Sequence, residues 1–286
     1  MNLYLPLPDQ KKTQPTAADV DAAVFLSVVI PVYNEQTRIG DTLFAVKDFL
    51  DCKDYDSEII VVDDGSLDTT LEVIRVIDIY QQEFKQQSPC RIAVNNQNTG
   101  KGFSVARGCR IAVGQFVLFM DADSSTDISE VDKLLSQMEQ PNNKETAPDV
   151  VIGTRRNKGL SQRPLHRRLL STGFRLCLKL AGIREYQDTQ CGFKLYRQHA
   201  IKKIIARQTV SRWCFDVEHL FIAEKLGLSI TSVPVIWRHT PGSKLSPISD
   251  SVKMLIELIR IRLRHRNLKK RTPTQTRTSS VRLLEK

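Results

Sequence analysis

Residues 26–35 read Leu-Ser-Val-Val-Ile-Pro-Val-Tyr-Asn-Glu, and this stretch decides the predicted fold. Residues 26–32 are almost continuously apolar and rich in β-branched side chains. A strand of this kind is usually buried on both faces, as in a parallel sheet that helices cover on both sides. Ligands of such sheets bind beyond the carboxyl ends of the strands, so we expect the polar turn at Tyr33, Asn34 and Glu35 to face a ligand.

Strands and helices alternate along the rest of the chain. Short apolar runs predict further strands at residues 58–63, 91–95, 116–121, 150–153 and 230–237. Apolar residues three and four positions apart predict helices at residues 37–50, 68–84, 102–113, 129–138, 163–180, 215–226 and 251–264. This order predicts an α/β fold with a doubly wound, mostly parallel central sheet flanked by helices.

A chain of 286 residues accommodates one large α/β domain with flanking segments. We expect a flexible arm at 1–22, which contains three prolines, and the folded domain at 23–248. A basic amphipathic helix is expected at 249–266, and the tail at 267–286 lacks apolar periodicity and is predicted to be disordered. The six cysteines form no Cys-x-x-Cys pair, so we expect reduced thiols.

Most of the net charge of +10 lies near the carboxyl end, where residues 252–286 hold eleven Lys or Arg and two acidic residues. A basic tail on a nearly neutral body predicts an anionic partner for the tail, either a membrane surface or nucleic acid. Residues 252–266 would then form an interfacial helix whose cations contact anionic lipid. The alternative is that Met254, Leu255, Leu258 and Ile261 pack on the domain.

The sequence contains no run of about 18–20 apolar residues, which is the length a membrane-spanning helix needs. The first 21 residues also lack an uninterrupted apolar stretch of the kind a signal peptide has. We therefore expect a cytoplasmic protein that is peripheral on a membrane.

Asp121-Ala122-Asp123 follows the predicted strand at 116–121. Side chains two apart in an extended segment point the same way, so Asp121 and Asp123 are predicted to present two carboxylates to one site. Two adjacent carboxylates repel each other unless a cation joins them, and their hard oxygens favour Mg²⁺ or Mn²⁺. Such an ion would neutralise a diphosphate leaving group. The alternative is that Asp123 only caps the next helix.

The first two strands also end in residues suited to a nucleotide. Asp63 and Asp64 precede the turn at Gly65, and one of these carboxylates is expected to accept hydrogen bonds from a base or ribose. Tyr33 can stack on a base, although a lone tyrosine is more often a core residue.

Two further segments predict contacts with phosphate. In the loop Asn98-Thr-Gly-Lys-Gly102, the glycines are expected to let the backbone approach a ligand, and Lys101 to contact a phosphate. This loop is not a Walker loop, and no GxGxxG follows the first strand, which disfavours a nicotinamide-dependent dehydrogenase. Between residues 150 and 180 the chain has eight Lys or Arg and no acid, and the cluster at 155–158 is expected to bind an anion.

In their order and spacing, these segments resemble the family-2 inverting glycosyltransferases with the GT-A fold, over residues 26–264. The resemblance is carried by Pro31-Val-Tyr-Asn-Glu35, Val62-Asp-Asp-Gly-Ser66, the loop ending at Gly102, Asp121-Ala-Asp123 and Gly153-Thr-Arg155. Three later segments resemble the dolichyl-phosphate β-glucosyltransferase branch, namely Asp188-Thr-Gln-Cys-Gly-Phe-Lys194, Arg212-Trp-Cys-Phe-Asp-Val-Glu218 and Gly242-Ser-Lys-Leu245.

The resemblance implies transfer of glucose from UDP-glucose to a polyprenyl (dolichyl-type) phosphate, with inversion at the anomeric carbon. It implies that the nucleotide sugar is bound by Pro31, Tyr33, Glu35, Asp63, Asp64, Lys101, Asp121 and Ala122. It places the metal on Asp121 and Asp123, and the acceptor phosphate on Arg155, Arg163, Arg168 and Lys244.

Asp188 and Asp123 are the candidates for catalytic residues. A phosphate acceptor is already largely ionised near neutral pH, since its second pKa is about 6, so positioning by Arg or Lys can replace a general base. Asp188 is therefore interpreted as an orienting or sugar-binding carboxylate, with a catalytic base and a turn-forming residue as alternatives. Asp216 and Glu218 are candidates for the acceptor side.

Other functions remain open at this point. A GDP-mannose-dependent polyprenyl-phosphate mannosyltransferase, or a family-2 transferase with a non-lipid acceptor, would use the same motifs. A nucleic-acid-binding protein would explain the basic tail but not the acidic strand ends, so no nucleic-acid partner is expected. Processive synthases carry Gln-x-x-Arg-Trp, whereas Gln208 precedes Arg212 by one residue too many, which disfavours polymerisation.

Overall fold

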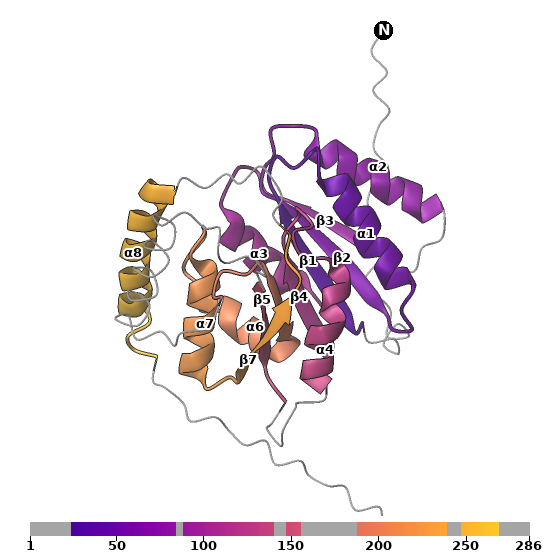
Figure 1. The fold of residues 1–286 in the computed structure, drawn as a ribbon. Coiled ribbons are helices and arrows are strands. Elements are labelled where there is room, and N and C mark those ends of the chain that lie inside the picture. Colours follow the sequence, from indigo (N-terminus) through magenta and orange to yellow (C-terminus); the bar gives the residue numbers. More distant parts are fainter. Residues whose placement is uncertain (1–23, 84–87, 140–146, 156–187, 239–246, 269–286) are drawn as a thin grey trace, which may run out of the picture.

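The computed structural model describes residues 24–83, 88–139, 147–155, 188–238 and 247–268, and places them in one α/β unit (Figure 1). The strands are β1 (Leu26–Val32), β2 (Ser57–Asp63), β3 (Cys90–Val94), β4 (Phe116–Met120), β5 (Val150–Arg155), β6 (Phe193–Arg197) and β7 (Ile230–Val235). The helices are α1 (Ile39–Asp51), α2 (Thr70–Glu83), α3 (Lys101–Ile111), η1 (Ile128–Glu130), α4 (Val131–Glu139), α6 (Gln198–Ile205), α7 (Phe215–Leu226) and α8 (Pro247–Arg264).

The seven strands form one sheet in the order β3-β2-β1-β4-β6-β5-β7. Neighbouring strands run parallel, except that β6 is antiparallel to both β4 and β5. The predicted α/β fold with a mostly parallel sheet is therefore confirmed. Three predicted segments lie outside the described residues, namely the helix at 163–180, the arm at 1–22 and the tail from 269 onward.

The sequence reading missed β6 and α6, and it placed three strand ends too late. β3 ends at Val94 rather than Asn95, β4 ends at Met120 rather than Asp121, and β7 ends at Val235 rather than Trp237. β6 reads Phe-Lys-Leu-Tyr-Arg, and its two cations interrupt the apolar run by which a buried strand is recognised. Lys194 is nevertheless fully buried, because the fold supplies it with a carboxylate from α7.

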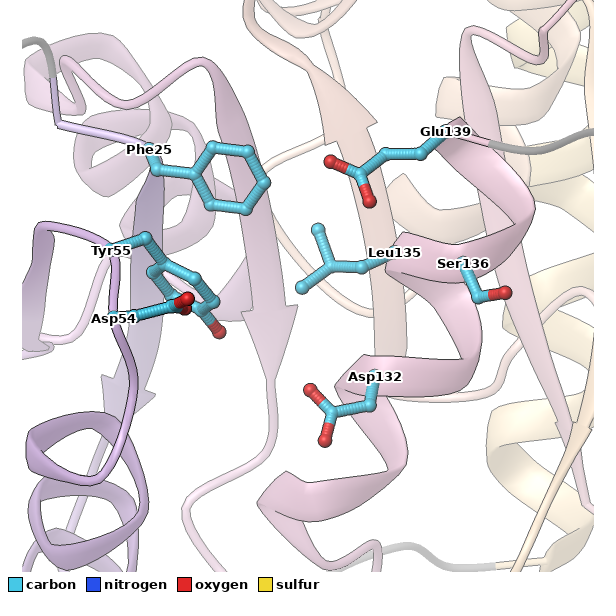
Figure 2. A pocket seen from close by; sticks show the side chains of 7 residues that line it. All are labelled: Phe25, Asp54, Tyr55, Asp132, Leu135, Ser136 and Glu139. Atoms are coloured by element: carbon cyan, nitrogen blue, oxygen red, sulfur yellow. The ribbon is translucent and has the colours of Figure 1, made fainter.

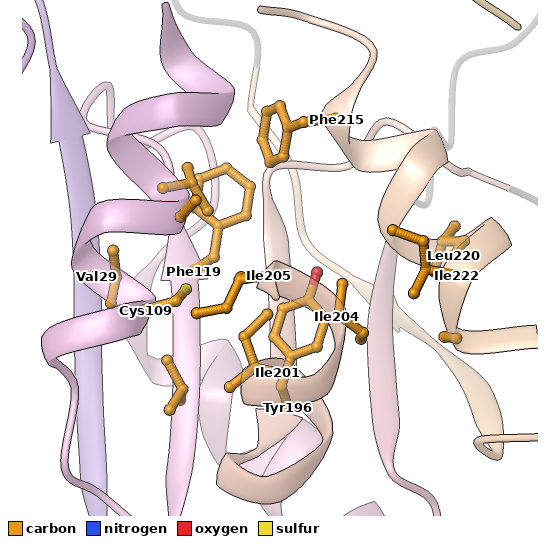
Figure 3. Packing of buried hydrophobic residues seen from close by; sticks show 14 of the residues in the cluster. Val29, Cys109, Phe119, Tyr196, Ile201, Ile204, Ile205, Phe215, Leu220 and Ile222 are labelled. Atoms are coloured by element: carbon orange, nitrogen blue, oxygen red, sulfur yellow. The ribbon is translucent and has the colours of Figure 1, made fainter. Parts of the chain in front are cut away.

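Helices cover both faces of the sheet, as the unbroken apolar strands require. Alternate residues of β1 and β4 enter one of two cores: Val29 and Phe119 pack under α3, α6 and α7, whereas Val28 and Leu118 pack under α1, α2 and α4. Figure 3 shows the first core, in which the Phe119 and Phe215 rings meet edge to face at 5.6 Å. This double burial fixes the register of the sheet and so the position of every strand end.

Helix α8 packs outside α7, at the edge of the unit (Figure 1). Leu258 and Ile261 are fully buried in the core beneath it, which confirms the packing alternative for these two residues. Ile256, Ile259 and Leu263 are 45–57% exposed on the opposite side of the helix. Among the described residues, no helix combines the length and apolarity that crossing a bilayer requires.

A shallow, open pocket lies at the amino edge of the sheet, far from the strand ends considered below (Figure 2). Phe25 and Tyr55, which precede β1 and β2, lie on one side of it with their ring centroids 4.7 Å apart and their planes tilted by 42°. Acidic side chains of α4, Asp132 and Glu139, line the other side. The pocket shares no residue with the predicted site.

Candidate active site

The predicted site residues gather at the carboxyl edge of the sheet, where β1 stands between β2 and β4. The chain leaves β1 towards β2 on one side, while β4 pairs with β1 on the other, so the loops after β1 and β4 diverge there. Such a switch point is where open α/β sheets bind ligands. Because β6 is antiparallel, the residues that precede it, 188–192, lie at this same edge.

Asp121 is the first residue after β4, and its carboxylate is held between Lys101 and Gly192. The Lys101 Nζ lies 2.5 Å from the Asp121 Oδ1, an oxygen that is itself buried, while a third of the whole side chain stays exposed. A Cβ on Gly192 would come within 2.0 Å of the Asp121 Oδ2, so a larger residue there would have to displace the carboxylate. The Asp121 N–H also donates to the Gly192 carbonyl at 3.1 Å.

Ala122 and Asp123 lie in a turn, not in the extended segment from which their common direction was predicted. The Ala122 carbonyl accepts a hydrogen bond from the Thr42 hydroxyl of α1 at 2.8 Å, which anchors the turn to the domain. The Asp123 Oδ1 accepts from the Ser125 N–H at 3.0 Å. Asp123 does not cap the next helix, because the carboxylate of Asp127 does so by accepting from Ser129.

Lys101 begins α3 and reaches over the edge of the sheet. Its ammonium lies 5.4 Å from the ring centroids of both Phe119 and Trp213. Burial alone would lower the pKa of Lys101, but the carboxylates of Asp121, Asp216 and Asp123 raise it above its ordinary value. Lys101 is therefore a permanent cation close to both acids of the Asp-Ala-Asp turn.

The glycines on either side of Lys101 allow another segment of the chain to pack closely against them. A Cβ on Gly100, whose φ is +104°, would lie 2.4 Å from the Ser211 carbonyl, and one on Gly102 would lie 2.7 Å from the Phe215 Cβ. Both glycines thus admit the chain's own segment at 208–215. This segment carries Trp213 to the ammonium of Lys101.

Asp63 and Asp64 lie at the carboxyl end of β2, and the carboxylate of each accepts hydrogen bonds from a different loop. The Asp64 carboxylate accepts from the Asn95 amide, from the N–H and hydroxyl of Thr99 and from the Gly100 N–H, at 2.7–3.0 Å. Burial acts to raise the pKa of Asp64, but these hydrogen bonds outweigh it and lower the pKa. Asp64 thereby fixes the loop before Lys101. The Asp63 carboxylate accepts from Ser66 at 2.5–3.3 Å.

The residues after β1 lie at the same edge of the sheet as the Asp-Ala-Asp turn, because β1 and β4 are parallel neighbours. Pro31 is buried inside β1 and pairs with Val62, so it shapes the strand end rather than facing a ligand. Tyr33 is half-buried, and Glu35 binds the Arg38 guanidinium, with the Nε 2.7 Å from its carboxylate. Hydrogen bonds join this turn to the loop after β2, including one from the Glu35 N–H to the Thr70 hydroxyl at 2.7 Å.

Arg155, at the end of β5, and Asp188, before β6, form a two-pronged ion pair. The Arg155 Nε and Nη2 lie 2.6 and 2.7 Å from the two Asp188 oxygens, and the Arg155 N–H donates to the same carboxylate at 3.2 Å. The guanidinium also faces the Trp237 ring at 5.5 Å. Burial would lower the pKa of Arg155, and Asp188 raises it, so the side chain stays cationic. Asp188 is placed to orient Arg155.

Asp216 and Glu218 lie in the first turn of α7, and both are buried inside the protein rather than lining an open surface. Asp216 pairs with the fully buried Lys194, whose ammonium also donates to the Cys191 carbonyl at 2.5 Å. Burial raises the pKa of Asp216, and Lys194 opposes that rise.

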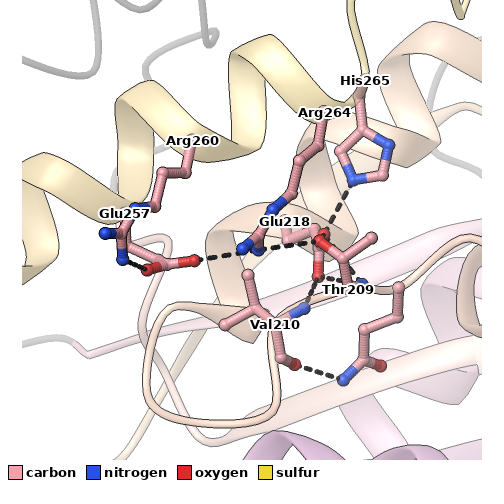
Figure 4. Close-up of polar contacts among 8 residues, drawn as sticks. Thr209, Val210, Glu218, Glu257, Arg260, Arg264 and His265 are labelled. Carbon is pink, nitrogen blue, oxygen red and sulfur yellow. Dashed lines mark hydrogen bonds and ion pairs between the residues drawn. The ribbon is translucent and has the colours of Figure 1, made fainter.

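Glu218 joins α7 to the segment at 208–215 and to α8 (Figure 4). Its carboxylate accepts from the Thr209 and Val210 N–H groups at 2.8–3.0 Å and from the His265 Nε2 at 2.7 Å. Burial acts to raise the pKa of Glu218, but these hydrogen bonds lower it. The predicted role of Glu218 at the acceptor side has no support in this geometry.

The sequence reading missed several positioning residues besides Lys194 and Gly192. Burial lowers the pKa of His219 to about 3, so its ring is neutral. The Gln208 amide donates to the Gly102 and Val210 carbonyls, which leaves its oxygen to accept from the His219 Nε2 at 2.8 Å. These hydrogen bonds could not be predicted from a local sequence pattern, because they join residues from separate segments of the chain.

Arg163, Arg168 and Lys244, which were predicted to bind the acceptor phosphate, lie outside the described residues. The other predicted residues lie at the carboxyl edge of the sheet. Those with side chains around the Asp-Ala-Asp turn are Asp121, Asp123, Lys101, Arg155 and Asp188.

The donor set fits a divalent metal in part. Asp121 and Asp123 offer hard carboxylate oxygens, which suit Mg²⁺ and Mn²⁺. Within the described ranges, no group of three or more His, Cys, Asp or Glu residues is arranged to hold a metal ion. A metal here would therefore need phosphate and water oxygens to complete its shell, as Mg²⁺ commonly does at nucleotide sites.

A model of glycosyl transferase family 2 matches residues 27–205. Dolichyl-phosphate beta-glucosyltransferase ALG5A of Trichomonas vaginalis is 35% identical over 93% of this chain and 82% of its own length. Dolichyl-phosphate beta-glucosyltransferase of Saccharomyces cerevisiae is 39% identical over 85% of this chain and 75% of its own length. Both similarities extend over nearly all of the described fold.

Solved structures share the fold at low sequence identity. Mannosyl-3-phosphoglycerate synthase from Rubrobacter xylanophilus matches with a TM-score of 0.60 at 16% identity, covering 88% of this chain and 78% of that one. Glucosyl-3-phosphoglycerate synthase from Mycobacterium tuberculosis, in complex with Mn²⁺, UDP-glucose and phosphoglyceric acid, matches with a TM-score of 0.56 at 18% identity, covering 89% and 85%.

Proposed function

The chain belongs to glycosyl transferase family 2 and is a glycosyltransferase, and on that premise we propose that it transfers glucose from UDP-glucose to a polyprenyl (dolichyl-type) phosphate with inversion. The observation that carries the donor and the acceptor is the identity of 35–39% to two dolichyl-phosphate beta-glucosyltransferases over at least 85% of the chain.

The geometry supports a reaction in which cations of the site stabilise the leaving diphosphate and hold the substrates in place. Asp121 and Asp123 would hold a divalent metal, which supplies positive charge to the diphosphate leaving group when bound. Lys101 stands beside both carboxylates and would contact the same diphosphate. Cations aimed at a group where negative charge develops lower the barrier, because they need no reorganisation during the reaction.

Arg155 is proposed to bind the acceptor phosphate, and Asp188 to keep its guanidinium in place. The two-pronged pair fixes the plane of the fork, and the cation keeps further N–H groups for a phosphate. A phosphomonoester has a second pKa of about 6 and is mostly ionised at neutral pH. Its oxygen can therefore attack the anomeric carbon without a protein base, which favours the positioning role of Asp188 over proton abstraction.

The assay offers labelled UDP-glucose and GDP-mannose separately, with polyprenyl phosphate and Mg²⁺ or Mn²⁺, and measures label in the lipid extract. We expect lipid-linked label from UDP-glucose. Label from GDP-mannose alone would replace the proposed donor but keep the acceptor. If the protein binds or hydrolyses a donor without forming a lipid product, the proposed lipid acceptor is wrong.

Helix α8 is proposed to rest on an anionic membrane surface, where a polyprenyl phosphate resides. Its exposed apolar side chains, Ile256, Ile259 and Leu263, face away from the buried Leu258 and Ile261. Exposed arginines at 260, 262 and 266 flank this apolar stripe. An apolar stripe bordered by cations suits the interface of anionic lipids.

Replacing Ile259 by aspartate is expected to weaken binding to vesicles containing anionic lipid by about tenfold or more, because a charge replaces apolar surface that would enter the lipid interface. Sedimentation with vesicles measures the bound fraction. Val76→Asp is the matched control, since Val76 is 66% exposed on α2. Equal binding by wild type and Ile259→Asp would contradict the proposed docking surface.

A further inference from the structure

The ion pair between Lys101 and Asp121 occupies the place at which the proposed metal would bind. The ammonium is 2.5 Å from the Asp121 Oδ1, and that oxygen is buried. The other carboxylate oxygen lies against Gly192, only 2.0 Å from the place where a Cβ at that position would stand. Asp121 thus already has a cation on one oxygen, and a metal must share the carboxylate with it.

The position of Lys101 is set by the fold rather than by an exposed, mobile side chain. The ammonium lies between the Phe119 and Trp213 rings, each 5.4 Å away, and the side chain is 23% exposed. Asp64 fixes the loop before it, and the segment at 208–215 packs against the glycines on either side. The cation is therefore held at the turn in the ligand-free protein.

We propose that Lys101 is a resident counter-cation that keeps the affinity of the Asp-Ala-Asp turn for a free divalent metal low, and that it transfers to the diphosphate when metal and nucleotide bind together. Two positive charges a few ångströms apart repel each other in a partly buried site, so a metal alone binds Asp121 poorly while Lys101 remains. A nucleoside diphosphate brings enough negative charge to accommodate both cations. The inference rests on the proposed function, since it takes the metal and the nucleotide from there.

This role explains why the site combines a lysine with two acids. Without Lys101, Asp121 and Asp123 would repel each other in the absence of ligand. With it, one of the two negative charges is compensated before the substrate arrives, and the metal enters mainly with the group on which it acts. Metal binding and nucleotide binding are then coupled, and the coupling acts equally on both ligands.

The test is a titration of the purified full chain with Mn²⁺, carried out first without UDP and then with UDP. Electron paramagnetic resonance measures the concentration of free Mn²⁺ at each step. Lys101→Met keeps an unbranched side chain between the two rings but removes the charge. We expect Lys101→Met to bind Mn²⁺ alone about tenfold more tightly than wild type, and UDP in the presence of Mn²⁺ about tenfold more weakly. Thermal unfolding confirms that each variant is folded, and Lys101→Gln replaces Lys101→Met if the latter is not.

Two controls separate charge from structure. Lys101→Arg keeps the charge and is expected to bind free Mn²⁺ as wild type does. Lys53→Met removes a lysine that pairs with Asp132 on the surface, away from the turn, and is expected to change neither affinity. The titration uses no sugar and no lipid acceptor, so an error in the proposed donor sugar or acceptor leaves it interpretable. Mn²⁺ affinity that is unchanged or weaker in the neutral variants, or undetectable in every protein, would overturn the inference.

Discussion

Replacing Asp123 by asparagine is expected to reduce glucose transfer by roughly 10²–10³-fold while leaving the fold intact. The substitution removes a negative charge that would hold the metal, and the loss falls on the stabilisation of the leaving diphosphate. Asparagine removes the charge and can keep the local hydrogen bond. The Asp123 Oδ1 accepts a hydrogen bond from the Ser125 N–H at 3.0 Å, and an amide oxygen can still accept it, so the turn should persist.

The measurement is the initial rate of transfer at saturating UDP-glucose and metal. Asp127→Asn is the matched control, because Asp127 accepts from Ser129 in the same loop in the same way but caps η1. We expect that control to retain transfer within a few-fold of wild type. Asp121→Asn is expected to resemble Asp123→Asn, since it removes the other carboxylate. Full transfer by both folded variants, Asp121→Asn and Asp123→Asn, would contradict a metal role for this turn.

The fold could be predicted from the sequence to the extent that it depends on local pattern. β1 and β2 each contain a run of at least four apolar residues, and the structure buries every residue of both strands. β6 could not be predicted in this way, because Lys194 and Arg197 break its apolar pattern. Whether a lysine can be buried depends on its partner, and Asp216 lies 22 residues further along the chain.

The candidate site shows the same limit more clearly. The order of motifs predicted that the polar ends of several strands meet, and these ends do lie at one edge of the sheet. The pair of Arg155 with Asp188 could not be predicted, because it depends on the antiparallel direction of β6, which brings residues 188–192 to the edge of the parallel strands. The role of Gly100 was missed for a similar reason, since its close neighbour, Ser211, is distant in sequence.

Both examples concern long-range partners rather than misread local chemistry. One of Asp63 and Asp64 was expected to accept hydrogen bonds from a base or ribose, and the structure shows four donors to Asp64 that come from Asn95, Thr99 and Gly100. Its carboxylate builds the loop that carries Lys101 to the Asp-Ala-Asp turn. An acid at a strand end can therefore serve a ligand indirectly, by fixing the residue that contacts it.

The buried pair of Lys194 and Asp216 leads to the largest expected change in stability. Lys194 is fully buried and Asp216 is 8% exposed at its side chain, so neither charge can be solvated if its partner is lost. Lys194→Met should lower the free energy of unfolding by about 3–5 kcal/mol, because it leaves an uncompensated carboxylate inside the protein. Denaturant unfolding, followed by circular dichroism, measures the change.

The double variant Lys194→Met/Asp216→Asn distinguishes the loss of charge compensation from the loss of packing. With no charge left to compensate, it should regain most of the stability, since a buried ion pair replaced by neutral groups of similar volume is often close to neutral in energy. Lys53→Met provides the surface control: its partner Asp132 is 51% exposed, and the expected cost is about 0–1 kcal/mol. If Lys194→Met destabilised the protein no more than Lys53→Met, the buried pair would not anchor β6 against α7, and the placement of residues 188–192 at the site would need another cause.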